Sequence, residues 1–191
     1  MMFYSFFRGF YKKAAKIMVN DCKSFIPLNS KILDFGCGSA IVAREFEESF
    51  KSEIIGIDII DNRVENIPFK LYDGKDISFF DDNSFDVVLV SYVLHHTNDP
   101  IGIFKRDIKR VAKDIVIVYE SPCDGLFYKL MCRIHGTSFA RFFQKNSIEG
   151  KFFTTKEWGD VFKENGFKIV KEKIVNNFPL RNTLFILKKG V

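Results

Sequence analysis

In the first half of the chain an acid lies in or directly after each of three apolar runs, and glycines follow two of these acids. These acids and glycines are Asp34, Gly36 and Gly38 in ILDFGCGSA (32–40), Asp58 at the end of EIIGID (53–58), and Asp73 and Gly74 at the end of FKLYDG (69–74). Glycine lets the backbone approach a bound molecule closely. A carboxylate accepts hydrogen bonds from hydroxyl, amine or ammonium groups. These residue types therefore predict a binding site for a small molecule with polar and cationic groups.

The elements that must position these residues are apolar runs alternating with helix-like segments. We predict strands at 31–35, 53–58, 69–74, 86–94, 114–120, 167–175 and 183–189, and helices at 3–26, 40–50, 99–111 and 155–166. Strands rich in Val, Ile and Leu that alternate with helices indicate an α/β fold, with a mainly parallel sheet covered on both faces. Such sheets bind ligands beyond the carboxyl ends of their strands. The acids and glycines are expected to meet there.

The glycine segment can be compared with that of a dinucleotide site. A dinucleotide site needs the pattern G-x-G-x-x-G/A, and GCGSAI places Ile41 at the last position. Asp34 beside the ligand would also repel a pyrophosphate. The residues favour a ligand with a cationic end and no phosphate, such as S-adenosylmethionine.

The order of these motifs carries a family resemblance. ILDFGCGSA, IIGIDI, the stretch YDGKDISFFDDNSFDVVLVSYVLHHTNDP, and the later segments IKRVAKDIVIV and FFTTKEWGDVFKENGF resemble class I S-adenosylmethionine-dependent methyltransferases. Within this class the chain resembles the small-molecule methyltransferases of the type-11 and ubiquinone-biosynthesis kind. The resemblance covers about residues 31–120 and 152–188. It implies a Rossmann-like, doubly wound sheet of seven strands. Ala40 departs from the family's third glycine, and the loops before residues 69 and 114 are short.

The resemblance also implies roles for individual residues in binding the cofactor. Asp34 would receive the ammonium group, Asp58 both ribose hydroxyls, and Asp73 the adenine amine. Ile59 would lie against the adenine, and Ser91 near the sulfur. The full set of predicted cofactor-binding residues is Asp34, Gly36, Gly38, Asp58, Ile59, Asp73, Gly74, Ser91 and, from the N-terminal helix, Tyr11.

Two residues are candidates for catalysis. His95 follows the fourth predicted strand and Glu120 ends the fifth, so both fall at the ligand-binding edge. The resemblance favours His95 over His96. A structural histidine and a rim carboxylate remain the alternatives. No metal is expected, because neighbouring histidines on an extended chain point apart and the four cysteines have no metal-ligand spacing. The cysteine usage favours a reduced intracellular protein.

The distribution of charge points to the segments that would select the methyl acceptor. The net charge is +5, and the basic excess lies in residues 1–30 and 121–156, which are also rich in aromatics. We expect a single domain, 1–191, with a helical cap at 1–27 and a cap insert at 121–153. These caps could form a lid over an aromatic, lipid-like or anionic acceptor, lie on an acidic membrane surface, or bind nucleic acid. We rank these three in that order.

The sequence thus predicts an enzyme that methylates a small-molecule acceptor. We expect it to be cytoplasmic, because no apolar run is long enough for a membrane span and Arg8 and Lys12 argue against a signal peptide. Two alternatives remain open. One is a non-catalytic subunit that binds S-adenosylmethionine or a partner, and the other is a nucleic-acid methyltransferase. The oligomeric state is open.

Overall fold

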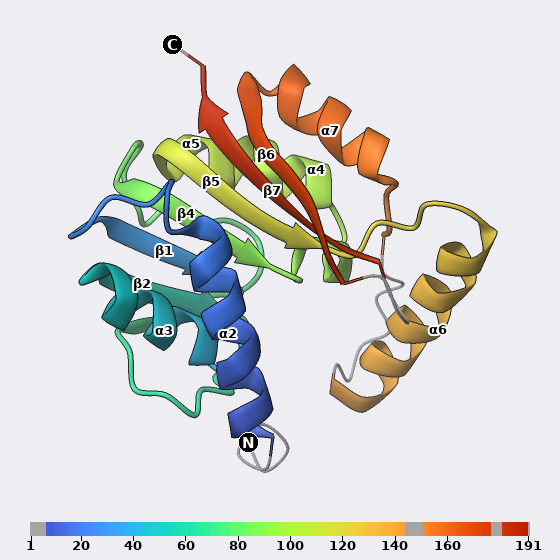
Figure 1. Cartoon of the computed structure of the whole chain (residues 1–191), viewed down its shortest axis with the longest axis horizontal. Helices are drawn as coiled ribbons and strands as arrows, with labels where there is room; N and C mark the ends of the chain where they lie inside the picture. The colour runs from blue at the N-terminus through green and yellow to red at the C-terminus, as the bar shows by residue number, and fades with distance from the viewer. Residues whose placement is uncertain (1–6, 144–150, 177–180, 191) are drawn as a thin grey trace. The chain divides into compact units, whose positions relative to one another are not determined.

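The computed structural model describes residues 7–143, 151–176 and 181–190 (Figure 1). The chain forms two compact units. The first unit comprises Met1–Leu89 and Arg110–Ile115, and the second comprises Val90–Lys109 and Val116–Val191. The predicted helical positions Phe3 and Phe6 lie outside the described residues.

A sheet of seven strands has the order β3-β2-β1-β4-β5-β7-β6. The strands are β1 (Lys31–Phe35), β2 (Glu53–Asp58), β3 (Phe69–Leu71), β4 (Phe85–Ser91), β5 (Ala112–Glu120), β6 (Phe167–Asn176) and β7 (Asn182–Lys189). β2 pairs in parallel with β1 and β3, and β6 pairs antiparallel with β7. The predicted α/β, Rossmann-like sheet of seven strands is confirmed.

Two strands end earlier than predicted. β3 stops at Leu71, so Asp73 and Gly74 lie in the loop that follows it. β4 stops at Ser91, and Tyr92 has a φ of 56°. A left-handed conformation ends the extended backbone there.

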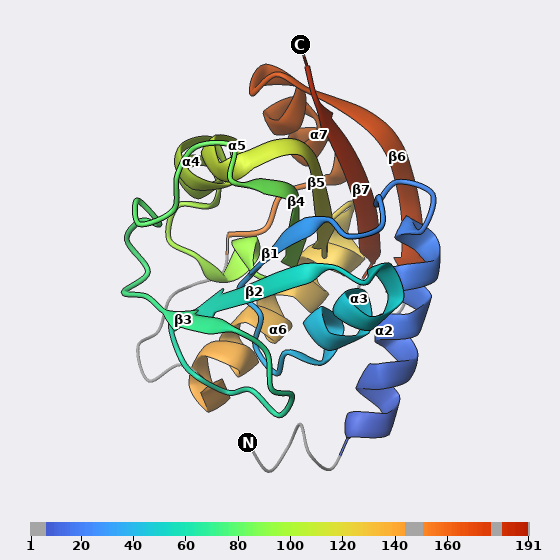
Figure 2. The same cartoon turned by 90° about the vertical axis from the view of Figure 1, so that its left-hand side faces the viewer.

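In the first unit, helix α2 (Arg8–Cys22) packs on helix α3 (Ile41–Phe50). Figure 2 shows both helices on the same side of β1 and β2. The buried residues of α2 are Ala15, Met18 and Cys22. The spacing of the apolar residues in this segment predicts that Phe10 and Ile17 lie on its buried face. Phe10 is 71% exposed and Ile17 is 54% exposed, so that prediction is wrong at both positions. The small residue Ala15 marks the side of α2 that is fully enclosed.

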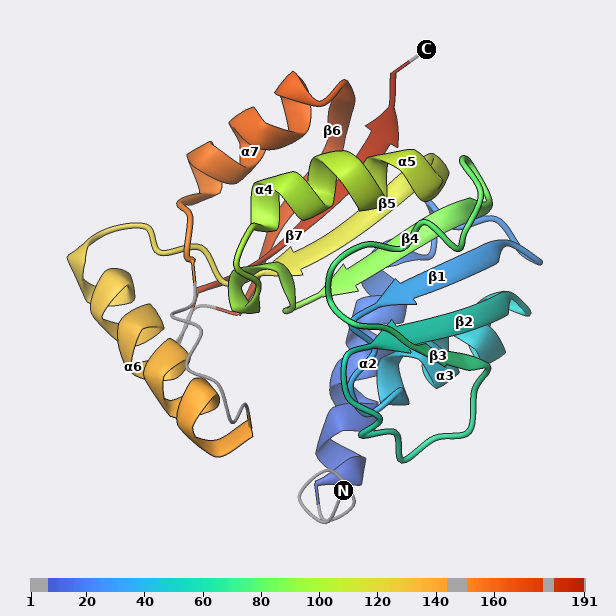
Figure 3. The same ribbon diagram turned by 180° about the vertical axis from the view of Figure 1, so that it is seen from behind.

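The second unit holds most of the remaining helices. They are η1 (Leu94–His96), α4 (Pro100–Ile103), the π-helical turn η2 (Phe104–Ile108), α6 (Leu126–Phe143) and α7 (Thr155–Glu164); the short α5 (Lys109–Val111) follows η2. Helix α7 packs on β6 (Figure 3). Phe104 and Phe185 both contact Phe162, with ring centroids 5.0 and 5.3 Å away. These aromatic rings form the core of the unit.

Two threonines lie at the start of α7. The sequence pattern predicts Thr155 as the cap of this helix, but Thr154 caps it and forms a reciprocal capping box with Glu157. The Thr155 hydroxyl instead donates to Asp124 Oδ2 at 2.5 Å. Both threonines therefore fix the beginning of α7, but through different partners.

Candidate active site

The predicted glycine loop, residues 36–40, is anchored to the end of β2. The backbone N–H groups of Gly36 and Cys37 both donate to the carbonyl of Ile57, at 2.8 and 3.0 Å. Gly36 and Gly38 have φ angles of 74° and 49°, which glycine adopts readily. A Cβ placed on Gly38 would meet no heavy atom within 4 Å. This bare stretch of backbone leaves room for a ligand at Gly38.

Asp58 shapes this loop through hydrogen bonds that the sequence did not reveal. Its Oδ2 accepts from the N–H of Gly38 at 2.9 Å. Its Oδ1 accepts from Ile59 N at 2.7 Å and from Ile60 N at 3.3 Å. Burial raises the pKa of Asp58, and these backbone bonds oppose that rise. Since a carboxylate offers about four acceptor positions, a ligand with two hydroxyls would displace the weakest of these bonds.

Asp34 is a buried carboxylate of the first unit. It lies on β1 and is only 1% exposed. Its Oδ1 is buried and has no hydrogen-bond partner among the residues that the structure describes. Burial, and secondarily the negative charge of Asp58, raises the pKa of Asp34 to about 7. An ammonium group would satisfy the open oxygen and favour the ionised form. Asp34 therefore fits a ligand with a cationic end, such as S-adenosylmethionine.

The residues predicted for the adenine side come partly together. Ile59 is 44% exposed, and its Cγ2 would lie 3.3 Å from a Cβ placed on Gly74. Asp73 is exposed and interacts with Lys75, accepting from its backbone N–H at 3.0 Å and lying 3.4 Å from its ammonium group. Ile59 and Gly74 thus adjoin, whereas the Asp73 carboxylate is engaged at the surface.

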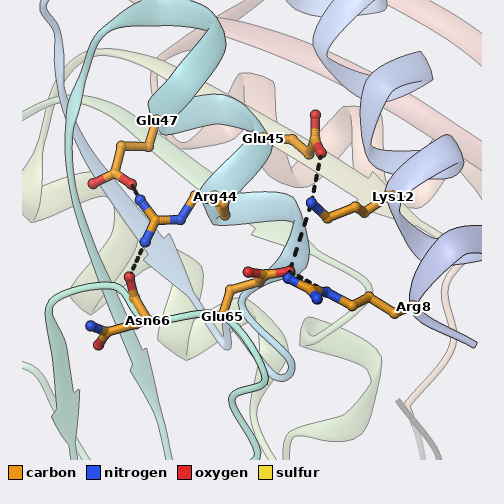
Figure 4. A network of polar contacts seen from close by, with 7 residues as sticks. All are labelled: Arg8, Lys12, Arg44, Glu45, Glu47, Glu65 and Asn66. Carbon is orange, nitrogen blue, oxygen red and sulfur yellow. Dashed lines mark hydrogen bonds and ion pairs between the residues drawn. The ribbon is translucent and has the colours of Figure 1, made fainter. Parts of the chain in front are cut away.

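A charged network joins α2 to the loop that follows β2 (Figure 4). Arg8 pairs with Glu65 at 2.7 Å, and Lys12 lies 3.9 Å from Glu45 and 4.0 Å from Glu65. The N–H of Glu65 also points to the carbonyl of Ser39, at 3.4 Å, within the glycine loop. The basic residues of α2 therefore fix a loop that contacts the candidate site. Sequence reasoning placed those bases on α2 but did not identify their partners.

Tyr11, the remaining residue predicted for the first unit, lies on α2. It is half-buried, and burial raises the pKa of its phenol. Its ring meets that of Phe10 edge-on, with centroids 5.9 Å apart. Its role in binding the cofactor stays a prediction.

In the second unit, the two residues predicted for catalysis form a buried pair. His95 Nδ1 is hydrogen-bonded to Glu120 Oε2, and the two side chains are 2% and 0% exposed. The other carboxylate oxygen of Glu120 accepts from the N–H of Leu94 at 2.9 Å. The His95 ring stacks on Phe152, with centroids 5.0 Å apart. The hydrogen bond to Glu120 and the stacking on Phe152 together hold the His95 ring in one orientation.

The residues at the end of β4 belong to the same unit. Ser91 is half-buried, and its predicted contact near the cofactor sulfur stays a prediction. Tyr92 donates its N–H to the carbonyl of Tyr119 at 2.8 Å. Burial raises the pKa of Tyr92 above its ordinary range, and Glu120 adds to the rise. A positive φ is rare for a bulky residue and is typical of functional segments. Nothing local in the sequence predicts it.

The described residues contain no cluster of three or more His, Cys, Asp or Glu side chains able to hold a metal ion. No helix in the described part of the chain is long and apolar enough to cross a membrane. All four cysteines are buried as free thiols.

Comparisons with known proteins agree with this geometry. A family model described as a methyltransferase domain matches residues 8–172. A ubiquinone biosynthesis O-methyltransferase from Neisseria meningitidis is 25% identical over 103 residues. The match covers 48% of this chain and 43% of that protein, so it spans less than half of the relative's length.

Solved structures share the fold. A SAM dependent methyltransferase from Archaeoglobus fulgidus is 15% identical, with a TM-score of 0.70 and coverage of 99% of this chain and 100% of that one. A magnesium protoporphyrin IX methyltransferase from Synechocystis, solved with bound SAH, is 14% identical, with a TM-score of 0.69 and coverage of 94% and 84%. The family model covers most of the chain. The chain therefore belongs to the methyltransferase domain family, within the class I group that uses S-adenosylmethionine as the methyl donor.

Proposed function

We propose that the protein transfers a methyl group from S-adenosylmethionine to a small-molecule acceptor whose reacting atom begins protonated, such as a hydroxyl oxygen. The observation that carries this proposal is the buried pair of His95 and Glu120. The names of two relatives add support, since one is an O-methyltransferase of ubiquinone biosynthesis and the other methylates a porphyrin. The acceptor we expect is aromatic, lipid-like or anionic.

The first unit would hold the cofactor, which supplies an activated methyl group on its sulfonium. Asp34 would receive the ammonium group, because its Oδ1 is buried with no partner among the described residues. The backbone at Gly36 and Gly38 would lie along the methionine part. Asp58 would accept the ribose hydroxyls, and Ile59 would lie against the adenine. Each of these roles is a proposal that binding measurements on single variants can check.

The second unit would supply the base. Glu120 is hydrogen-bonded to Nδ1 of the His95 imidazole. The other ring nitrogen, Nε2, is therefore the atom that would accept a proton. The cofactor, held by Asp34 and Asp58, would supply the methyl group, and its carbon–sulfur bond would be replaced by a bond from that carbon to the acceptor oxygen. The hydroxyl proton passes to Nε2 of His95 and then to water. Glu120 stabilises the positive imidazolium that forms. A carboxylate that orients a catalytic histidine acts in this way in other enzymes.

The test has two stages. First, the protein is incubated with S-adenosylmethionine and a fractionated metabolite extract, and formation of S-adenosylhomocysteine identifies the acceptor. Second, His95→Gln and Glu120→Gln are assayed on that acceptor. Loss of a general base should lower kcat by about 10²–10⁴-fold, with the dissociation constant of the cofactor unchanged. The matched control is His96→Gln, whose ring lies 4.0 Å from that of His95 and which should retain its activity.

Three results would contradict the proposal. Equal losses in His95→Gln and His96→Gln would indicate a structural effect on the whole segment. An unchanged kcat in His95→Gln would exclude a base at this position. Binding of S-adenosylmethionine with no product from any extract would favour the alternative of a non-catalytic binding subunit.

A further inference from the structure

Helix α6 carries a stripe of large apolar side chains that are half or more exposed. Leu126 is 90% exposed, and Phe127, Leu130 and Ile134 are 51–55% exposed. At about 100° per residue these four positions fall within an arc of about 100° on the helix. Single exposed apolar residues are common, but a continuous stripe marks an interaction surface.

The opposite side of α6 attaches the helix to its own unit. Cys132 is 2% exposed, and its thiol lies 3.8 Å from the carbonyl of Ser121. Just before the helix, Asp124 accepts from Thr155 N at 2.8 Å and pairs with Arg181 at 3.2 Å. The helix is therefore held by one side and by its beginning, which presents the apolar stripe outward.

Basic side chains border the stripe. Lys129 and Arg133 are both exposed, and on the helix they fall about 60° and 20° from its edge at Leu126. The segment 125–134 contains no acidic residue. The exposed part of α6 is thus apolar along one side and positive beside it. Basic residues beside exposed apolar side chains are one feature of helices that lie in the interface of an anionic bilayer.

We propose that α6 binds the surface of a membrane containing anionic lipids, with its apolar stripe among the acyl chains and Lys129 and Arg133 at the lipid phosphates. Charge complementarity favours this partner over a second copy of the chain. A twofold contact through the stripe would bring two positive helices together, which like charges oppose. The composition of the stripe favours lipid over nucleic acid, because only one of its four side chains, Phe127, offers a ring on which a base can stack. This inference is independent of the proposed methyl transfer.

The experiment is co-sedimentation of the full chain with vesicles of phosphatidylcholine, alone or with about a third phosphatidylserine. The protein should bind the anionic vesicles and bind neutral ones far more weakly, and added salt should reduce binding. The double variant Leu126→Ser/Leu130→Ser should lose about ten-fold or more of its affinity, because two side chains no longer enter the acyl region. Lys129→Gln/Arg133→Gln should lose about ten-fold on anionic vesicles only.

Two matched controls separate the surface of α6 from general effects. Leu28→Ser removes a leucine that is 62% exposed in the other unit, and Lys105→Gln/Lys168→Gln removes two exposed charges elsewhere. Both controls should bind as the unaltered protein does. Thermal unfolding is measured for every variant, to check that each is folded.

Several outcomes would overturn the proposal. One is no binding of the unaltered protein to anionic vesicles. Another is equal loss in the α6 variants and their controls. A third is a dimer, seen by sedimentation in the absence of lipid, that disappears in Leu126→Ser/Leu130→Ser, because the stripe would then be a contact between copies. All three can be read without any methyl acceptor, so failure here is distinct from failure of the proposed reaction.

Discussion

Replacing Asp34 by asparagine should stabilise the ligand-free protein at pH 8 and weaken cofactor binding at the same time. The Asp34 carboxylate is buried, and its Oδ1 has no partner among the described residues. Asparagine has nearly the same shape and no charge. The variant therefore removes the cost of burying a negative charge and, with it, the proposed partner of the ligand's ammonium group.

The magnitude follows from the pKa of Asp34. Burial and Asp58 raise it from 3.8 to about 7, so the folded protein keeps a proton that the unfolded chain has already lost. The free energy of unfolding therefore falls as the pH rises from about 4 to about 7, and it levels off above that. Three pKa units correspond to about 4 kcal/mol as an upper bound. A buried amide with an unpaired group costs about 1–3 kcal/mol, which leaves a net gain for the variant of about 1–3 kcal/mol.

The assay is thermal unfolding of both proteins from pH 5 to pH 9. For a chain of this size the gain corresponds to roughly 2–10 °C at pH 8, and the two curves should converge near pH 5. Titration calorimetry should show affinity for S-adenosylmethionine reduced by about 10–100-fold, because a charge-assisted hydrogen bond is lost.

Asp86→Asn is the matched control for this prediction. Asp86 lies on β4, where its carboxylate accepts from Lys31 N at 2.9 Å and from Lys113 Nζ at 3.3 Å. The hydrogen bond from Lys31 holds the pKa of Asp86 below its ordinary value. This group stabilises the protein at neutral pH and loses that effect as the pH falls, so the variant should be less stable at pH 8. If Asp34→Asn also lowered stability at pH 8, the buried charge would not be the cost we assign to it.

Three further predictions test other parts of the first unit. Asp58→Asn should weaken cofactor binding by about 10–100-fold and lower stability by about 1–2 kcal/mol, because its amide cannot accept from every backbone donor that Asp58 now holds; calorimetry and urea unfolding measure the two effects. Lys51→Gly should raise stability by about 0.5–1 kcal/mol in urea unfolding, since Lys51 ends α3 in the left-handed conformation, with a φ of 51°. Its control is Lys23→Gly, which should lower stability because Lys23 ends α2 with a φ of −56°. Glu65→Gln should lower stability by less than about 1 kcal/mol at low salt, and a difference that persists in high salt would show that its ion pairs are not the cause.

Much of the sheet could be predicted because its strands are continuous apolar runs. β1 and β2 begin and end where the sequence predicts, since an acid or a glycine turn follows each run. The errors arise where packing decides. Phe10 and Ile17 fit a helical period, yet α2 buries Ala15 and exposes both. A periodic pattern identifies a helix but does not identify which part of a wide apolar face another helix covers.

The sequence could predict which residues form the candidate site, but not the hydrogen bonds that join them. The carboxyl ends of parallel strands explain why Asp34 and Asp58 could be identified. The hydrogen bond from Gly38 N to Asp58 joins residues twenty positions apart, and local patterns contain no information about such a contact. The pair of His95 and Glu120 depends on β4 lying next to β5. A histidine just after one strand and a glutamate ending the next was the only signal available.

Oδ1 of Asp34 connects the stability of the first unit to its proposed function. If an ammonium group pairs with Asp34, the ionised form is favoured and its pKa falls toward the ordinary value. Saturating S-adenosylmethionine should therefore abolish the fall in stability between about pH 4 and pH 7 and release close to one proton on binding at pH 6. Calorimetry in two buffers of different ionisation enthalpy measures that proton. Binding without proton release would mean that the ammonium group has another partner, and Asp34 would then be a structural carboxylate of the sheet.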